Sequence, residues 1–143
     1  MLRRETTALV VHCAATTPTQ DIGAAEIRKW HVEERGWSDI GYHYVIRRNG
    51  TVETGRPVTD VGAHVAGYNS ETVGICLVGG INERGDPDAN YTDAQWNSLH
   101  GLLVALRVRY PHARICGHRD FPNVLKACPS FDVASWARDK IGL

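Results

Sequence analysis

Short, mostly apolar runs alternate along the chain with longer segments in which apolar residues recur every three or four positions. The short runs predict strands, and the first two of these strands are expected to be buried. They span Ala8–Ala14, Val73–Val78 and Ala113–Gly117. A hairpin is predicted between the first two, because Asn49-Gly50 separates the β-rich runs Tyr42–Arg48 and Thr51–Arg56 and both turn residues tolerate a positive φ.

Three segments have the periodicity and the end signals of helices. The first is Ala24–Arg35, with Gly23 as its N-cap. The second begins at the capping box Thr92–Gln95 and has one apolar stripe. That stripe consists of Trp96, Leu99, Leu103, Leu106 and Tyr110. The third is short, with Asp132 as its N-cap and an inner face of Val133, Trp136 and Ala137.

The order of these elements is strand, helix, hairpin, strand, helix, strand, helix. Parallel strands need crossover connections, which the helices supply, whereas the hairpin adds an antiparallel pair. We therefore predict an α/β fold with a central mixed β-sheet flanked by about three helices. No repeat, low-complexity tract or linker interrupts the chain, so we predict a single domain over residues 1–143, which is a usual domain size.

Charge and hydropathy exclude two classes of partner. The chain has 16 basic and 16 acidic residues, whereas nucleic-acid-binding proteins usually present an electropositive face. No stretch approaches the roughly 20 apolar residues of a membrane span. The run Ala8–Ala15 behind Arg3 and Arg4 resembles a weak signal peptide, but His12 interrupts it, so we predict no signal peptide.

The four cysteines are Cys13, Cys76, Cys116 and Cys128. Disulfide-stapled secreted domains are denser in cysteine and poorer in core residues, whereas 43% of this chain is hydrophobic. We expect four free thiols, most of them acting as small buried hydrophobes. Cys128 is the exception, because it stands near other residues that can carry chemistry.

Three potential metal ligands stand at or beyond the ends of predicted strands: His12, His118 and Cys128. Two imidazoles and a thiolate form a donor set that zinc prefers, and three protein ligands leave a fourth position for water, as in catalytic sites. Two alternatives remain open. A lone strand histidine is more often a hydrogen-bonded core residue, and Cys128 or Cys13 could instead be a nucleophile beside a histidine.

Two further residues could assist such a centre. Lys126 precedes Cys128 by two positions, where its ammonium could stabilise a developing oxyanion, although a surface lysine is the commoner role. Tyr42 begins a predicted strand, where its phenol could hydrogen-bond the attacking water or a tetrahedral intermediate. Otherwise Tyr42 is an amphipathic residue at a strand edge.

Several stretches of the sequence resemble the zinc N-acetylmuramoyl-L-alanine amidases, which include amidase-type phage lysozymes and the peptidoglycan recognition proteins. In chain order they are Val10–Thr16, Trp37–Tyr44, Asn49–Glu53 with Gly55–Arg56, Gly62–Asn69, Val73–Gly79, Gly117–Asp120 and Lys126–Asp132. No single stretch is decisive, but their order and joint presence are specific. The resemblance covers nearly the whole chain and is strongest to the short phage enzymes.

The resemblance implies a role for eight residues. His12, His118 and Cys128 would bind one Zn²⁺ per chain, and Tyr42 and Lys126 would assist catalysis. The residues implied to contact the substrate are His64, Asn69 and His43. The loop between His118 and Cys128 is somewhat longer than in similar phage enzymes, which leaves open the path of the chain around Pro122–Leu125 and the aim of Lys126.

The implied activity is hydrolysis of the amide between N-acetylmuramic acid and L-alanine of peptidoglycan, by a monomeric phage or prophage endolysin. Without a signal peptide, such a protein would wait in the host cytoplasm until the membrane is permeabilised, and would then act on the cell wall. Two alternatives stay open. One is a non-catalytic peptidoglycan-binding module, a class that typically lacks the cysteine ligand. The other is a regulator of a phage RNA polymerase.

Overall fold

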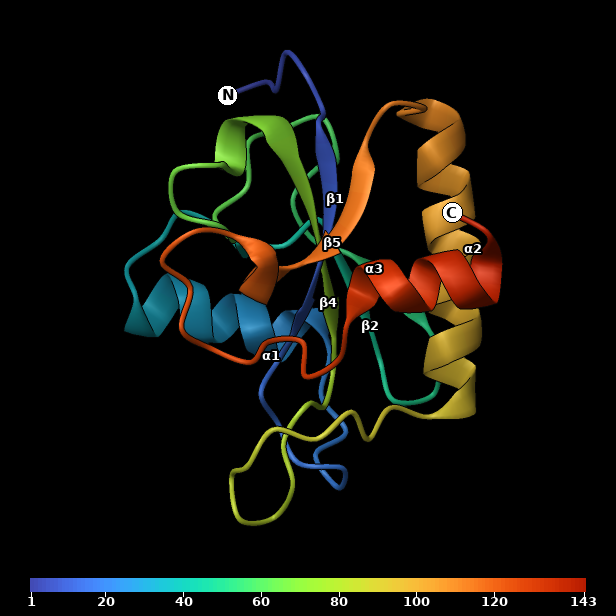
Figure 1. Ribbon diagram of the computed structural model, residues 1–143. Helices are drawn as coiled ribbons and strands as arrows, with labels where there is room; N and C mark the ends of the chain where they lie inside the picture. Colours follow the sequence, from blue (N-terminus) through green and yellow to red (C-terminus); the bar gives the residue numbers. More distant parts are fainter.

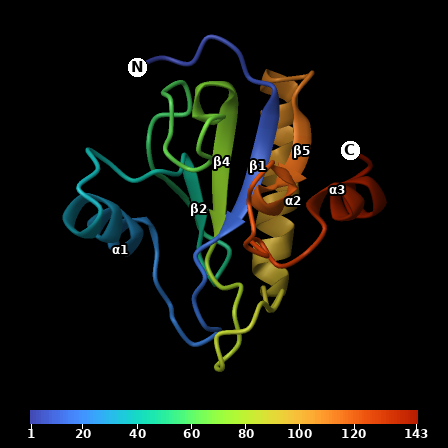
Figure 2. The ribbon, with the colours of Figure 1, turned by 60° about the vertical axis from the view of Figure 1, so that its left-hand side comes forward.

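A five-stranded sheet runs through the middle of the computed structural model, which describes residues 1–143 (Figures 1 and 2). Its strands are β1 (Ala8–Cys13), β2 (Tyr44–Ile46), β3 (Val52–Thr54), β4 (Thr72–Leu77) and β5 (Arg114–Gly117). Their spatial order is β3-β2-β4-β1-β5. Neighbouring strands are parallel except β2 and β3, which form the hairpin. The predicted α/β class and mixed sheet are confirmed.

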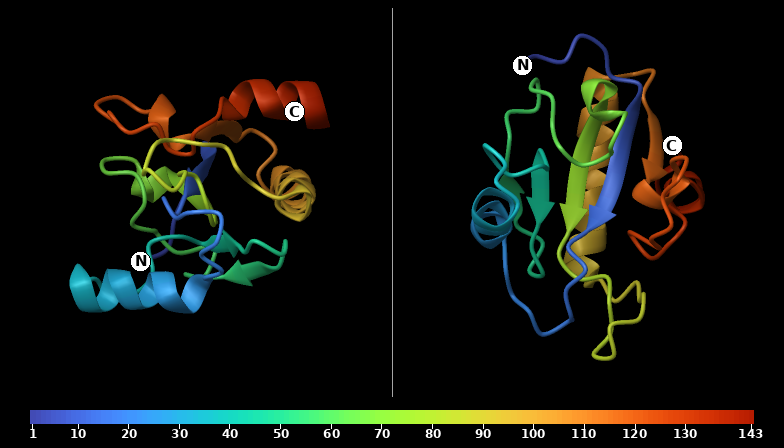
Figure 3. Two further views of the ribbon diagram at one scale, coloured as in Figure 1. Left: turned by 90° about the horizontal axis from the view of Figure 1, so that it is seen from below. Right: turned by 90° about the vertical axis from the view of Figure 1, so that its left-hand side faces the viewer.

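Helices cover both faces of this sheet. They are α1 (Ala24–Lys29), which continues in wider turns over Trp30–Glu34, α2 (Asp93–Arg109), and α3 (Val133–Trp136), which continues over Ala137–Ile141. Single 3₁₀ turns occur at Asn69–Glu71 and His118–Asp120. The view from below shows α1 on one side of the sheet and α2 and α3 on the other (Figure 3). None of the helices is both long and apolar enough to cross a membrane.

The capping box predicted from the sequence starts α2. Thr92 Oγ1 accepts the backbone N–H of Gln95, and the Gln95 side chain accepts the N–H of Thr92 in return. The Gln95 amide also donates to the carbonyls of Ile46 and Val78, at 3.2 and 2.8 Å. The first turn of α2 is therefore tied directly to the sheet, and this fixes the helix over the strands.

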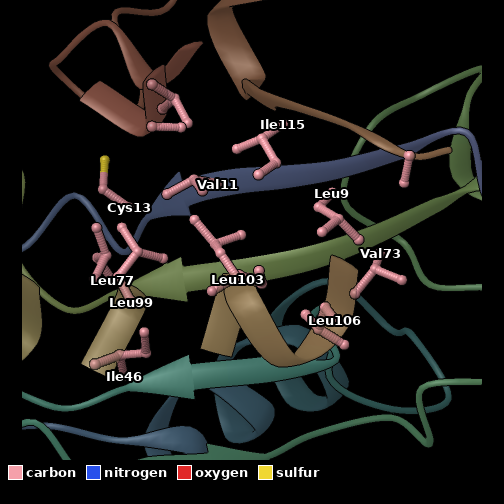
Figure 4. Close-up of a cluster of buried hydrophobic side chains, with 14 of the residues drawn as sticks. Leu9, Val11, Cys13, Ile46, Val73, Leu77, Leu99, Leu103, Leu106 and Ile115 are labelled. Carbon is pink, nitrogen blue, oxygen red and sulfur yellow. The ribbon is translucent and has the colours of Figure 1, made fainter. Parts of the chain in front are cut away.

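The larger core fills the space between the sheet and the helices α2 and α3 (Figure 4). Successive residues of a strand face opposite sides of a sheet, so Leu9, Val11 and Cys13 of β1 face this core. Leu99, Leu103 and Leu106 of the predicted α2 stripe pack against them. The intervening residues of β1 point to the side of α1. His12 is one of these, and it lies close to the carboxyl end of its strand.

The hairpin strands are shorter than predicted, because their outer residues pair irregularly. The N–H of His43 still donates to Gly74, and the N–H of Gly55 to His43, at 2.9 and 2.8 Å. Gly55 has no room for a side chain, since a Cβ there would lie 2.3 Å from the carbonyl oxygen of Tyr42. The chain beyond Thr54 therefore crosses closely over the start of β2 instead of continuing a regular ladder.

Candidate functional site

The three predicted metal ligands come together at the carboxyl ends of β1 and β5. His12 lies within β1, His118 follows β5 directly, and Cys128 lies in the loop beyond. One ligand atom from each residue lies within 4.8 Å of the other two. In open α/β sheets, ligands bind outside the carboxyl ends of the strands. The three side chains therefore stand where a site is expected and are close enough to share one ion.

Backbone hydrogen bonds hold Cys128 in this group. Its Sγ accepts the N–H of Cys13 at 3.1 Å, and its carbonyl accepts the N–H of Arg119 at 2.9 Å. The next residue, Pro129, accepts the Tyr91 hydroxyl at 2.6 Å. All four cysteines are free, as predicted. The Cys128 loop is thus fixed to β1 and to the turn that follows β5, without a disulfide.

Burial keeps the two candidate histidine ligands uncharged. The pKa of His12 lies well below its usual 6.5, mainly because the ring is buried and secondarily because His64, His118 and His43 are near. Burial and the charge of Lys126 also lower the pKa of His118. Histidine binds a metal only in its neutral form, so both rings are ready to accept an ion at neutral pH.

Cys128, in contrast to the histidines, must be charged to bind a metal. The neighbouring Cys13 thiol and burial both raise the pKa of Cys128, so its sulfur carries a proton in the metal-free protein. A thiol must lose that proton to become a ligand, and a bound divalent cation favours the loss. This donor set therefore fits zinc, which binds thiolate and neutral imidazole together.

Tyr42 and Lys126 both line the pocket that contains the three residues. The Tyr42 ring centroid lies 5.1 Å from that of His12. Burial, reinforced by nearby cysteines, raises the pKa of Tyr42 well above 10, so its phenol stays protonated and can donate a hydrogen bond. Lys126 has an exposed side chain on the pocket wall. The longer loop therefore still delivers Lys126 to the site.

The pocket encloses about 210 Å³ and includes residues that the sequence did not single out. These are His31, Arg35, Trp37 and Ala63. His31 Nδ1 accepts the N–H of Gly41 at 2.9 Å, and burial lowers the pKa of the ring to about 4. A neutral ring that accepts at Nδ1 carries its proton on Nε2. The signal for His31 was its position one turn after Ile27, on the buried face of the turns that continue α1.

Only one of the three predicted substrate-binding residues lines the pocket, namely His64. His43 is fully buried: its Nδ1 accepts the N–H of Gly74 and its Nε2 bonds the Asp60 carbonyl. Asn69 Oδ1 accepts the N–H groups of His64 and of Val65, each at 2.8 Å. The structure thus does not bring His43 or Asn69 to the pocket. Asn69 instead supports the backbone of the segment that carries His64, and His43 joins Gly74 of β4 to Asp60.

Comparison with known proteins assigns this arrangement to a family. The profile described as N-acetylmuramoyl-L-alanine amidase matches residues 2–131. The chain belongs to the N-acetylmuramoyl-L-alanine amidase family. The matched range contains all eight residues that the sequence motifs selected. The resemblance inferred from those motifs is therefore confirmed.

Phage endolysins are among the similar members of this amidase family. The chain is 54% identical over 134 residues to the endolysin of Klebsiella phage KP32, covering 94% of this chain and 87% of that protein. It is 51% identical to the endolysin of Escherichia phage T7, with the same coverage. Among solved structures, the N-acetylmuramoyl-L-alanine amidase LysC from Clostridium intestinale URNW superposes with a TM-score of 0.81 at 29% identity, over 97% of this chain and 87% of that one.

Proposed function

We propose that this protein is a zinc-dependent N-acetylmuramoyl-L-alanine amidase of the endolysin type, which cuts peptidoglycan between N-acetylmuramic acid and L-alanine. The observation that carries the proposal is the convergence of one ligand atom each from His12, His118 and Cys128 within 4.8 Å. Membership of the amidase family and the similarity to phage endolysins support the reaction class.

The three residues that would hold zinc are two neutral imidazoles and one thiolate, so the loaded site would have a net charge of +1. When bound, zinc supplies a Lewis acid that activates water and polarises the scissile carbonyl. His12 is buried, with 1% of its surface exposed, so bulk water is kept away from its side of the site. Lys126 lines the same pocket and is exposed, so the polymer can reach it.

The chain's own residues then have distinct tasks. Tyr42 holds its proton and donates a hydrogen bond beside His12, where it orients the attacking water or the tetrahedral oxygen. Lys126 places a positive charge at the pocket wall, where it offsets the negative charge that develops on that oxygen. Preorganised groups of this kind contribute most when water is excluded, which fits the half-buried Tyr42 better than the exposed Lys126.

The alternative of a non-catalytic peptidoglycan-binding module needs none of this chemistry. Such a module would not require Cys128, nor a protonated tyrosine and a lysine lining the same pocket. Regulation of a phage RNA polymerase and a monomeric state stay predictions. Co-purification with the polymerase and analytical ultracentrifugation test them.

Digestion of purified peptidoglycan tests the proposed function. We expect free peptides that begin with L-alanine, glycan strands of unchanged length, and loss of activity when a chelator removes the metal. Adding zinc back should restore the rate. New reducing sugar ends would indicate glycosidic cleavage instead. Binding without product, or full activity in metal-free protein, would contradict the proposal.

A further inference from the structure

A chain of hydrogen bonds leads away from His12 into the protein. His12 Nε2 lies 2.8 Å from Nδ1 of His64, and His64 Nε2 lies 3.1 Å from Oγ1 of Thr72. The Thr72 hydroxyl donates to the carbonyl of Tyr68 at 2.9 Å. His12, His64 and Thr72 are buried, with 1%, 9% and 1% of their surfaces exposed. Water molecules therefore compete little for the hydrogen bonds of these three side chains.

The last bond in this chain sets the direction of the others. A carbonyl only accepts, so the single hydroxyl proton of Thr72 points to Tyr68, and Oγ1 must accept from His64 Nε2–H. A neutral imidazole has one N–H, so His64 Nδ1 is an acceptor and receives the proton on His12 Nε2. The remaining nitrogen of His12, Nδ1, then carries a lone pair and no proton.

If the hydrogen bonds ran in the opposite direction, His12 could not bind a metal. If Thr72 donated to His64 instead, the 2.9 Å bond to Tyr68 would be lost, His64 would carry its proton on Nδ1, and His12 Nε2 would accept it. The His12 proton would then sit on Nδ1, so neither ring nitrogen would offer a free lone pair. Metal-binding histidines usually donate their second N–H to an acceptor that fixes the tautomer. Here that acceptor is a second histidine.

We propose that His64 and Thr72 are positioning residues, which fix the proton of His12 on Nε2 and thereby present Nδ1 as the zinc ligand. The proposal rests on the zinc site of the proposed function. It also assigns His64 a role that does not require contact with substrate. The polymer need not reach Thr72 at all, because this residue lies behind His64.

The backbone around His64 is built to hold the ring in place. Asn69 fixes the backbone N–H of His64, as described above. The ring lies against two glycines: an added Cβ would approach it to 2.6 Å at Gly74 and to 2.9 Å at Gly62. Such close approach leaves the ring little freedom to turn away from His12.

The test compares three variants that differ by single groups. Thr72→Val keeps the shape of the side chain and removes the hydroxyl, Thr72→Ser keeps the hydroxyl, and Thr7→Val is a matched control. Thr7 is a half-buried threonine whose hydroxyl bonds the Glu71 carbonyl at 3.3 Å, outside the site. Long-range ¹⁵N–¹H NMR spectra of metal-free protein give the tautomer of each histidine, and competition with a chelator gives the zinc affinity.

We expect metal-free wild type to have His12 and His64 both protonated on Nε2. Thr72→Val should give mixed tautomers and weaken zinc binding by about 10-fold, the lower end for loss of a group behind a ligand. Thr72→Ser and Thr7→Val should match wild type. A merely structural role would not change the tautomer.

Two failures are distinguishable. If wild type binds zinc but Thr72→Val retains the wild-type tautomers and affinity, or if wild-type His12 is protonated on Nδ1, the positioning role is wrong and the zinc amidase stands. If wild type binds no zinc, the proposed function fails and the positioning role fails with it.

Discussion

The backbone N–H of Cys13 donates to the sulfur of Cys128 across 115 positions of sequence, at 3.1 Å. Cys13 is the last residue of β1, next to His12, so this bond joins the two ends of the candidate metal site. This bond alone favours the thiolate form of Cys128, whereas the Cys13 thiol and burial together raise the pKa of Cys128. Strand β1 therefore supplies one candidate ligand and orients another.

Replacing Cys128 with alanine should abolish zinc binding and nearly all amidase activity. Two ligands rarely retain a catalytic zinc ion, because three protein groups are the usual minimum. Metal content by mass spectrometry and release of L-alanine peptides measure the effect.

Cys116→Ala is the matched control for Cys128→Ala. Cys116 is buried in the separate cluster with Val10 and Phe121, so its loss should lower the unfolding free energy by about 1 kcal/mol and leave zinc content unchanged. A Cys128→Ala protein with full metal content and full rate would remove the zinc assignment.

Lys126→Ala should retain zinc and lose rate. Removing one group that stabilises an oxyanion typically lowers kcat by about 10²-fold. Because Lys126 is exposed, we expect the loss in kcat not to exceed this value. The control is Lys140→Ala, an exposed lysine beyond α3. Kinetics on soluble muropeptides separate kcat from KM. Stoichiometric loss of zinc in Lys126→Ala would show that the residue supports the metal instead of the reaction.

Much of this fold follows from local patterns. The capping box Thr92–Gln95, the stripe of α2 and the Asn49-Gly50 turn are all local signals that predicted the right elements. The ends of the hairpin strands were wrong because they depend on close crossing of distant backbone at Gly55. No short-range pattern encodes that crossing.

The candidate site, like the fold, could be predicted from the sequence only in part. Residue type and position at or beyond predicted strand ends selected His12, His118 and Cys128, and the structure places one ligand atom of each within 4.8 Å of the others. The His12–His64–Thr72 chain was not foreseen, since it depends on which face of the neighbouring strand meets a loop. Asn69 and His43 were expected at the substrate, but their polar atoms bond the protein's own backbone. Only tertiary packing reveals such partners.

Gly74→Ala should disturb the site more than a single methyl group suggests. The added Cβ would lie 2.6 Å from Cγ of His64, and a ring held also by Gly62 cannot move aside freely. Overpacking of this kind costs about 1–3 kcal/mol. Chemical denaturation measures the loss, and chelator competition should show weaker zinc binding, because a displaced His64 no longer bonds His12.

Gly101→Ala is the control for this change. Gly101 lies inside α2 with no atom within 4 Å of an added Cβ. Alanine is the better helix former, so this variant should gain about 1 kcal/mol and keep its zinc affinity. Equal effects of the two substitutions would contradict the packing argument at Gly74.

Acid should destabilise the metal-free protein through His43. Burial lowers the pKa of this ring from 6.5 to about 4 in the folded state. The neutral ring accepts the N–H of Gly74 at Nδ1. Between these pH values the unfolded chain binds a proton that the folded chain does not. Stability contributed by neutral His43 is therefore present above pH 6.5 and is lost as the pH falls toward 4, by about 2 kcal/mol at pH 5. Urea unfolding in the presence of a chelator across this pH range measures the slope of the unfolding free energy against pH. The His43→Gln substitution should reduce this slope by about 1.4 kcal/mol per pH unit, which is the value for one proton. An unchanged slope in His43→Gln would assign the acid sensitivity to the other buried histidines.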